Sequence, residues 1–185
     1  MDDNASQSPP DFEPTTLSPP VDASVPIPNF RRVTPFLFRG GQPGEEGFKA
    51  LAELGVRTVV NLRWRPRHVA VEREQVEATG MAYVSFRLAY WVLPNEKVIN
   101  DFLAIVDDSA RRPIFVHCLH GADRTGLLVA IFRISRQGWS VEDAYKDMKG
   151  CGYHRFRVRN FKWNLFYFAR KYKERQAKEG SRDHF

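Results

Sequence analysis

The sequence has few cysteines and no long apolar run. These two features argue against a disulfide-rich protein, a zinc-ribbon protein and an integral membrane protein. Two cysteines in 185 residues, Cys118 and Cys151, are too few and too far apart for a disulfide framework or a zinc ribbon. The longest apolar run, from Leu127 to Phe132, is far shorter than the roughly 18 residues that a membrane span needs. We therefore expect no metal site, no integral membrane association and a free thiol that is available for chemistry.

Basic residues are absent from the first 30 positions, where five acidic residues lie. The net charge of +6 therefore becomes +11 for residues 31–185. A strongly basic domain favours an anionic substrate, and on charge alone it equally suits nucleic acid or an acidic membrane surface. Nucleic-acid binding would need aromatic residues interleaved on a basic face, and the sequence has no such pattern. We therefore expect no nucleic-acid partner.

Proline is concentrated at the N-terminus, where seven of the twelve prolines lie within residues 1–28. A segment with so few apolar residues cannot offset its ordering entropy, so residues 1–28 are expected to be a disordered or loosely attached acidic leader. Residues 29–175 are expected to form the domain, and residues 176–185 a charged tail. No export signal is visible, which leaves open both a cytoplasmic location and export after removal of a signal peptide. The oligomeric state is open as well.

Helical and strand patterns alternate from Phe30 onward. Apolar spacing predicts helices over residues 44–54, 69–79, 96–106 and 127–137, and strands over residues 56–62, 82–86 and 114–117. Ser140 with Asp143 predicts the capped start of a shorter helix, and Asn160 predicts the start of a last one. The apolar residues expected to face inward from that helix are Phe161, Leu165, Phe168 and Tyr172. Strands separated by helices indicate an α/β domain with a central, mainly parallel sheet flanked by helices.

The string IFVHCLHGADRTGLLVAIF holds the residues that can do chemistry. Cys118 follows directly after an apolar strand, and five residues lie between Cys118 and Arg124. An apolar helix comes next. A tight loop between a strand and a helix turns successive backbone N–H groups inward, and the helix dipole adds partial positive charge. We therefore expect this loop to bind a phosphate group. The residues expected to contact the phosphate are Leu119, His120, Gly121, Ala122, Asp123 and Arg124.

Each polar residue of the loop has an expected role. Cys118 is the predicted nucleophile, because positive surroundings stabilise a thiolate. Arg124 can present a bidentate fork to two phosphate oxygens. Thr125 is placed to donate its hydroxyl to the thiolate and to ease its departure from a phosphocysteine. His117 and Gly126 are predicted to support the shape of the loop.

Two other interpretations of the loop fit the sequence less well. A Walker-type nucleotide site needs a Gly-Lys pair, and this chain has Arg-Thr in that place. If Cys118 were only a small buried core residue, the Arg and the two glycines at these offsets would have no explanation.

The string HCLHGADRTG resembles the signature loop of the cysteine-based protein tyrosine phosphatases. The runs PNFRRVTPFLFRGGQP, LGVRTVVNLR and GYHRFRVRNFKWNL are similar to the compact dual-specificity phosphatases of bacteria and to their plant and fungal atypical relatives. The resemblance covers about residues 28–172. It implies a dual-specificity phosphatase-like fold that hydrolyses phosphotyrosine, phosphoserine or phosphothreonine through a phosphocysteine intermediate, without a metal or cofactor. Some members act on phosphoinositides or inositol phosphates, which is the alternative substrate class.

The chain departs from this family where a general acid is usual. The family has an Asp on a separate loop before the Cys, whereas the stretch from Ala89 to Pro94 contains no acidic residue. Asp123 is the expected acid, because its place resembles that of the in-loop Asp proposed as the acid of myotubularin and Sac phosphatases. Asp123 could equally accept N–H bonds within the loop, and Glu96 and Asp101 are the alternatives. Because the stretch from Ala89 to Pro94 has no acidic residue, the protein could also be a pseudophosphatase that binds phosphorylated partners without turnover.

Residues outside the loop are candidates for the walls of the site. Tyr90 and Trp91 can flank a phosphotyrosine ring or pack at the rim. Arg39 and Arg63 follow strand-like segments and can contact extra anionic groups or form surface ion pairs. Within the loop only His120 can add positive charge, which argues against a very highly phosphorylated inositol and favours an aryl phosphate.

The segment after the next helix offers further candidates. Tyr153 and His154 lie in a glycine-containing turn and are candidates for a second wall. Cys151 is expected to be a buried bystander thiol, with a protective disulfide to an oxidised Cys118 as the alternative.

Overall fold

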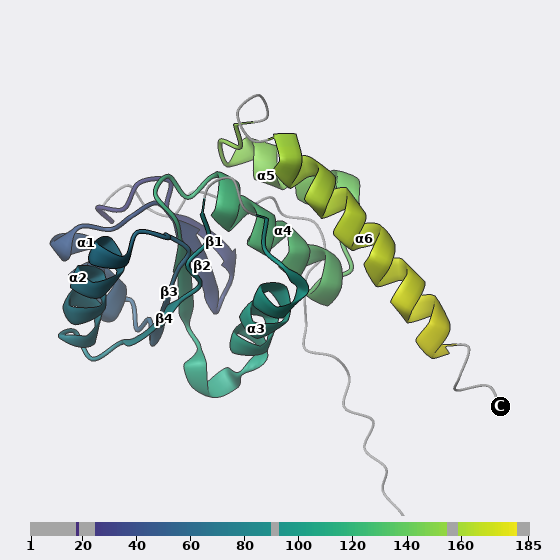
Figure 1. Cartoon of the computed structure of the whole chain (residues 1–185). Coiled ribbons are helices and arrows are strands. Elements are labelled where there is room, and N and C mark those ends of the chain that lie inside the picture. Colours follow the sequence, from purple (N-terminus) through teal and green to yellow (C-terminus); the bar gives the residue numbers. More distant parts are fainter. Residues whose placement is uncertain (1–17, 19–24, 90–92, 155–158, 181–185) are drawn as a thin grey trace, which may run out of the picture.

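A five-stranded sheet in the order β1-β2-β5-β3-β4 forms the centre of the computed structural model, which describes residues 18, 25–89, 93–154 and 159–180 (Figure 1). The strands are β1 (Arg31–Thr34), β2 (Leu37–Gly40), β3 (Thr58–Asn61), β4 (Ala82–Ser85) and β5 (Ile114–His117). Only β1 pairs antiparallel with its neighbour β2, and the other neighbouring strands are parallel. The predicted mainly parallel sheet is confirmed.

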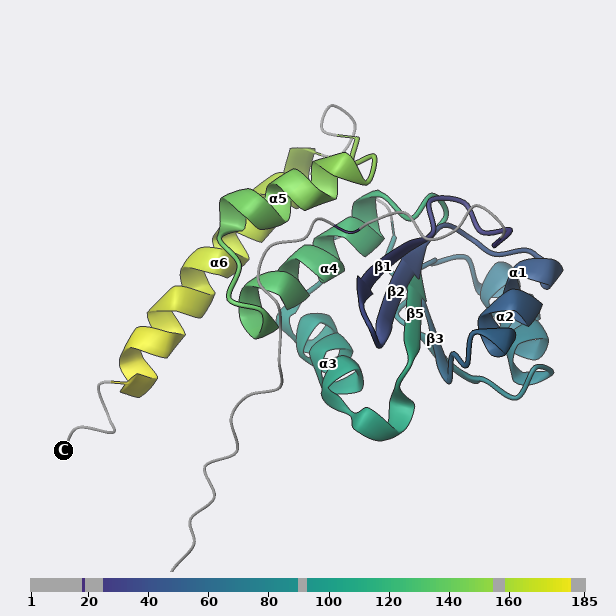
Figure 2. The ribbon, with the colours of Figure 1, turned by 180° about the vertical axis from the view of Figure 1, so that it is seen from behind.

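Helices cover both faces of this sheet (Figures 1 and 2). They are α1 (Glu45–Glu53), α2 (Pro66–Glu77), α3 (Glu96–Asp107), the short 3-10 helix η1 (Ser109–Arg111), α4 (Asp123–Arg136), α5 (Val141–Gly150) and α6 (Arg159–Gly180). The helices α1 and α2 lie on one face, and α3 to α6 lie on the other. The predicted α/β class with flanking helices is therefore confirmed as well.

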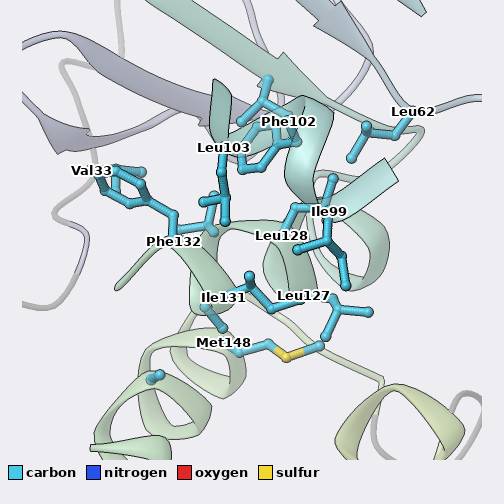
Figure 3. Close-up of a cluster of buried hydrophobic side chains, with 14 of the residues drawn as sticks. Val33, Leu62, Ile99, Phe102, Leu103, Leu127, Leu128, Ile131, Phe132 and Met148 are labelled. Atoms are coloured by element: carbon cyan, nitrogen blue, oxygen red, sulfur yellow. The ribbon is translucent and has the colours of Figure 1, made fainter. Parts of the chain in front are cut away.

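Each face of the sheet has its own apolar core, because successive strand residues point to opposite sides. Phe115 packs among the residues under α1 and α2, whereas its neighbour Val116 belongs to the larger cluster on the other face. Figure 3 shows part of that larger cluster, where Phe102 and Leu128 meet between α3 and α4. The side chains of α4 are buried from Asp123 to Ser135, since this helix lies between the sheet and its neighbours α3, α5 and α6.

Helix boundaries differ from the predictions at two functionally relevant places. The helix α4 begins at Asp123, four residues before the predicted start, so Arg124 lies in its first turn. The helix α6 begins at Arg159, and Asn160 is therefore inside it and not its cap. The predicted cap of α5 is confirmed, because Ser140 Oγ accepts the backbone N–H of Asp143 at 3.0 Å.

The described part of the proline-rich stretch touches the domain. Ile27 is buried in the core under α1 and α2. Ser18 is also buried, and its N–H donates to Asp147 Oδ1 at 2.7 Å. Packing therefore begins before residue 28, and α6 continues past residue 175 to Gly180. The division into leader, domain and tail stays a prediction.

The carboxyl ends of the central strands lie together at one edge of the sheet. Residues Gly40, His117 and Asn61 are level in the register of β2, β5 and β3. The chain continues from β2 and β3 to α1 and α2 on one face, and from β5 to α4 on the other. Ligands of open α/β sheets bind where connections diverge in this way, and Cys118 follows β5 at that point. Among the described residues, no helix is long and apolar enough to cross a bilayer.

Candidate active site

The predicted phosphate loop runs from the end of β5 to the start of α4. Cys118 is the first residue of the loop and is only 2% exposed, so its thiol lies at the base. Leu119 and His120 are exposed, whereas Gly121 and Ala122 are buried. The backbone N–H groups of the first turn of α4 have no partners within the helix, and this end carries partial positive charge. The predicted nucleophile therefore lies at the positive end of α4.

Gly121 allows the loop to turn against strand β2. Its φ is +69°, and a Cβ placed there would lie 2.3 Å from the carbonyl carbon of Gly40. The turn therefore needs glycine both for its backbone conformation and for its close approach. Gly126 lies in α4, where a Cβ would come within 3.4 Å of Arg39 Nη2, and its predicted support of the loop stays a prediction. A Cβ at Gly126 would come within 2.9 Å of the side chain of Met148 on α5.

Hydrogen bonds from Nη1 hold the guanidinium of Arg124 in place. Its Nη1 donates to the carbonyl oxygens of Leu62 at 3.3 Å and Leu88 at 3.1 Å, and the side chain is buried. These bonds hold the plane of the fork beside the loop, as bidentate phosphate binding requires. The hydroxyl of Thr125 is buried and has no hydrogen-bond partner among the described residues. Its donation to the thiolate stays a prediction.

His117 makes a hydrogen bond to the loop, and its role in supporting the loop stays a prediction. Its Nδ1 lies 3.2 Å from the carbonyl oxygen of Cys118, and its Nε2 lies 2.7 Å from Glu72 Oε1. Gln42 donates to the other oxygen of Glu72 at 2.8 Å, and its backbone N–H donates to the carbonyl of Leu119 at 3.1 Å. A buried polar network on α2 and the β2–α1 connection thus supports the loop from behind.

The sequence analysis did not identify Glu72, although its spacing from Val69 and Val76 places it on the buried face of α2. Val69, Glu72 and Val76 recur on one face of α2, and all three are buried. An acidic residue in such an apolar stripe needs a partner, because burying an unpaired carboxylate is costly.

Asp123 lies in the first turn of α4 and is only 3% exposed. Its Oδ1 accepts the backbone N–H of His154 at 2.9 Å, and its Oδ2 lies 3.3 Å from His154 Nδ1. Both oxygens are thus engaged in tying the start of α4 to the segment after α5. This geometry favours the accepting role over proton donation, and the general-acid role of Asp123 stays an untested prediction.

The alternative acids have partners elsewhere. Glu96, in the first turn of α3, pairs with Arg175 of α6 at 2.9 Å, and Asp101 pairs with Lys97 on its own helix. None of these partners belongs to the loop. The aromatic wall that we expected from Tyr90 and Trp91 lies outside the described residues.

Arg39 is not at the mouth of the site, which corrects our expectation. It is fully buried beneath the loop, where its Nη2 donates to the carbonyl of Gly121 at 2.8 Å. Its Nη1 lies 3.8 Å from Asp147, which also accepts from Arg133 at 3.2 Å. Burial lowers the pKa of Arg133, and Asp147 opposes that shift. This buried ion cluster holds the loop to α4 and α5.

Two further residues were expected to line the active site, and one lies in the core while the other lies at the surface. Tyr153 is buried in the core, so it is not a wall of the site. His154 is half-exposed and lines a cavity of about 500 Å³ with His120. Cys151 is a free, buried thiol whose pKa is raised by burial. The described residues contain no cluster of His, Cys, Asp or Glu that could hold a metal ion.

A second cavity, of about 320 Å³, adjoins the loop on the side of α2. Its basic lining comes from Arg63, Arg67 and His68, while Gln42 and Glu72 connect it to the loop. Arg63 donates to Gln42 Oε1 at 2.8 Å, and its contact with an anionic group stays a prediction.

Solved structures of cysteine phosphatases have the same fold. TpbA of Pseudomonas aeruginosa superposes with a TM-score of 0.65 and 24% identity over 84% of this chain and 89% of TpbA. A TpbA variant in complex with phosphotyrosine gives a TM-score of 0.64 at 22% identity, over 83% of this chain and 98% of that one. The catalytic domain of the PP-IP phosphatase SIW14 of S. cerevisiae gives 0.68 at 22% identity, over 85% and 95% of the two chains.

Sequence comparisons agree with the fold. The dual specificity protein phosphatase TpbA of Pseudomonas aeruginosa is 27% identical over 72% of this chain, which spans only 57% of TpbA. The inositol diphosphatase DSP2 of Oryza sativa subsp. japonica is 31% identical over 71% of this chain and 67% of its own length. The family profile described as a DSP-PTPase phosphatase fused to NAD+ kinase matches residues 23–163. The chain therefore belongs to this DSP-PTPase family, within the cysteine-based dual-specificity phosphatases.

Proposed function

We propose that the protein is a cysteine-dependent phosphatase that hydrolyses phosphate monoesters, with protein tyrosine or dual-specificity activity. The observation that carries this proposal is the position of Cys118, which is buried at the base of a loop between a parallel strand and the positive end of α4. Arg124 in the first turn of that helix has its guanidinium fixed beside the same loop. A thiol that can act as a nucleophile and a bidentate oxyanion binder thus lie at one anion site.

The reaction follows from these positions. The Cys118 thiolate attacks phosphorus, and an S–P bond forms as the P–O bond to the leaving group breaks. The leaving oxygen takes up a proton. Water then attacks the phosphocysteine, the S–P bond breaks, and inorganic phosphate leaves as the thiolate is restored. Arg124 and the backbone N–H groups of the loop stabilise the charge on the transferring oxygens in both steps.

Turnover of an aryl phosphate by the native chain, Cys118→Ser and Cys151→Ser tests the proposal. We expect Cys118→Ser to lose turnover while it still binds inorganic phosphate, and Cys151→Ser to keep turnover. Undiminished turnover by Cys118→Ser would contradict the proposal. A native chain that binds phosphate without turnover would identify a pseudophosphatase.

A second candidate function is supported by the basic cavity beside the loop. Arg63, Arg67 and His68 line this cavity of about 320 Å³. A substrate with several phosphates can place one in the loop and another there. An inositol phosphate or phosphoinositide phosphatase is therefore the alternative, and the rice relative DSP2 is named an inositol diphosphatase.

Comparing a phosphotyrosine peptide, a soluble inositol polyphosphate and phosphoinositide vesicles separates the two substrate classes. If the cavity binds a second phosphate, Arg67→Ala raises KM for the inositol polyphosphate by about tenfold and leaves the peptide unchanged. Equal effects on KM for both substrates would show that the cavity does not bind a second phosphate. Arg73→Ala, on the same helix and outside the cavity, is the control.

A further inference from the structure

Two successive carbonyl groups of the phosphate loop accept hydrogen bonds from side chains outside the loop. Arg39 Nη2 donates to the carbonyl of Gly121 at 2.8 Å, and Asn29 Nδ2 donates to that of His120 at 3.3 Å. The C=O and the N–H of one planar trans peptide group point in opposite directions. Donors that hold these carbonyls outward therefore direct the N–H groups of Gly121 and Ala122 inward, where an anion binds. We call these two donors the Arg39 clamp and the Asn29 clamp.

The side chain of Asn29 is used in full. Besides its bond to the loop, Nδ2 donates to the carbonyl of Cys151 at 2.9 Å, and Oδ1 accepts from Arg31 Nε at 3.0 Å. Asn29 has a φ of +53°, a left-handed conformation that asparagine tolerates better than most residues. Its amide is thus held between the loop, the end of α5 and Arg31 on β1.

The Arg39 clamp depends on a single carboxylate. Arg39 Nη1 lies 3.8 Å from Asp147 Oδ2, and the same oxygen accepts from Arg133 Nε at 3.2 Å. Arg39, Arg133 and Asp147 are all buried, so two guanidinium groups share one negative charge. A buried ion cluster of this kind is favourable only when its geometry is good. The position of the Asp147 carboxylate therefore determines how firmly Arg39 is held.

Ser18 contacts the supports of both clamps. Its N–H donates to Asp147 Oδ1 at 2.7 Å, and no other described residue donates to that oxygen. Its hydroxyl donates to Asp147 Oδ2 at 3.2 Å and accepts from Arg133 Nη2 at 2.9 Å. Its carbonyl accepts from Arg31 Nη1 at 3.0 Å. Ser18 is only 3% exposed, and hydrogen bonds away from water are stronger than those at the surface.

We propose that Ser18 is a positioning residue that joins the Arg39 clamp to the Asn29 clamp. Its N–H and hydroxyl hold Asp147, the counter-ion of Arg39. Its carbonyl holds Arg31, which in turn fixes the amide of Asn29. Ser18 acts through these side chains, because none of its hydrogen bonds in the described part of the chain goes to the loop. The inference rests on the phosphate binding of the proposed function and does not require turnover.

Proton–nitrogen NMR of the native chain, titrated with inorganic phosphate, tests whether the clamped amides bind the anion. We expect the amide protons of Gly121 and Ala122 to move downfield as phosphate binds, because each donates to an oxyanion. Phosphate binding that leaves both amide signals in place would overturn the inference. Binding without turnover would overturn the proposed enzymatic function and leave the inference standing.

Ser18→Ala tests the link itself. This variant leaves Arg133 Nη2 without its acceptor and Asp147 Oδ2 without one donor, so we expect the phosphate dissociation constant to rise by about fivefold. Calorimetric titration with inorganic phosphate measures this change. Ser109→Ala, which replaces an exposed serine in η1, is the control and should bind phosphate like the native chain. Native affinity in Ser18→Ala would contradict the inference.

Combining Ser18→Ala with Asn29→Gly tests whether the two clamps are joined. Asn29→Gly removes the amide while glycine keeps the positive φ without strain, and we expect it to weaken phosphate binding by about tenfold. The double variant should lose less affinity than the product of the two single effects, because loss of the Ser18 contacts already loosens Arg31. A loss equal to that product would show that Ser18 and Asn29 act independently and would overturn the inference.

Discussion

The buried guanidinium of Arg39 donates a hydrogen bond of 2.8 Å to the carbonyl oxygen of Gly121. A residue of strand β2 thus holds the turn of the phosphate loop, which lies 82 positions further along the chain. The loop is shaped by the sheet beneath it as well as by its own sequence.

Replacing Arg39 should therefore weaken both stability and phosphate binding. Arg39→Met leaves the carbonyl of Gly121 and part of the Asp147 charge without a donor, so we expect the free energy of unfolding to fall by about 3 kcal/mol. The phosphate dissociation constant should rise by about tenfold, because the loop loses its support. Urea unfolding and phosphate titration measure the two effects. Arg32→Met, exposed on the neighbouring strand, is the control, and equal losses in both variants would contradict this role.

Gly121 should tolerate alanine much less well than other glycines with positive φ. Gly80 has a φ of +83° and open space where a Cβ would lie, whereas a Cβ on Gly121 would meet the backbone of Gly40. We expect Gly80→Ala to cost about 1 to 2 kcal/mol of stability from backbone strain alone. Gly121→Ala should cost at least about 3 kcal/mol and abolish phosphate binding. Thermal unfolding of the two variants is the measurement, and similar melting temperatures would show that the approach to Gly40 is unimportant.

Asp123→Asn distinguishes an anchor from a general acid. Because both carboxylate oxygens of Asp123 contact His154, we expect kcat to keep its alkaline limb in the variant. The rate should fall by much less than the roughly 100-fold that loss of a general acid brings. A pH profile of kcat with an aryl phosphate gives both quantities. Disappearance of the alkaline limb would identify Asp123 as the general acid.

The two cysteines should differ in reactivity. Burial raises the pKa of the Cys151 thiol, so this thiol stays protonated to a more alkaline pH than an exposed cysteine does. We expect iodoacetamide to label Cys118 and to spare Cys151 between pH 6 and pH 8. Peptide mapping of the native chain measures the labelling. Preferential labelling of Cys151 in this range would contradict the assignment of the two thiols.

The loop and the alternation of helices and strands were predictable, because both follow from local pattern. Patterns of only a few residues predict the capped start of α5 at Ser140 and the strand β5 that ends just before Cys118. The earlier start of α4 at Asp123 was missed, because the polar residues Asp123, Arg124 and Thr125 gave no apolar periodicity.

The supports behind the loop were not predictable from local pattern. Arg39 looked like a surface residue, but β2 lies between β1 and β5, and every residue of β2 is buried. Leu37 and Arg39 share one face of that strand, which is the face covered by α4 and α5, where Asp147 lies. Glu72 depended in the same way on a partner 45 positions away, His117. Such pairs become visible only when the topology brings the elements together.

Trapping the covalent intermediate tests the central claim most directly. A rapid acid quench of the native chain during turnover of an aryl phosphate, followed by peptide mass spectrometry, locates the transferred phosphoryl group. We predict phosphocysteine at Cys118, and no phosphorylated peptide from Cys118→Ser. Turnover with the phosphoryl group on another residue, or undiminished turnover by Cys118→Ser, would contradict the account.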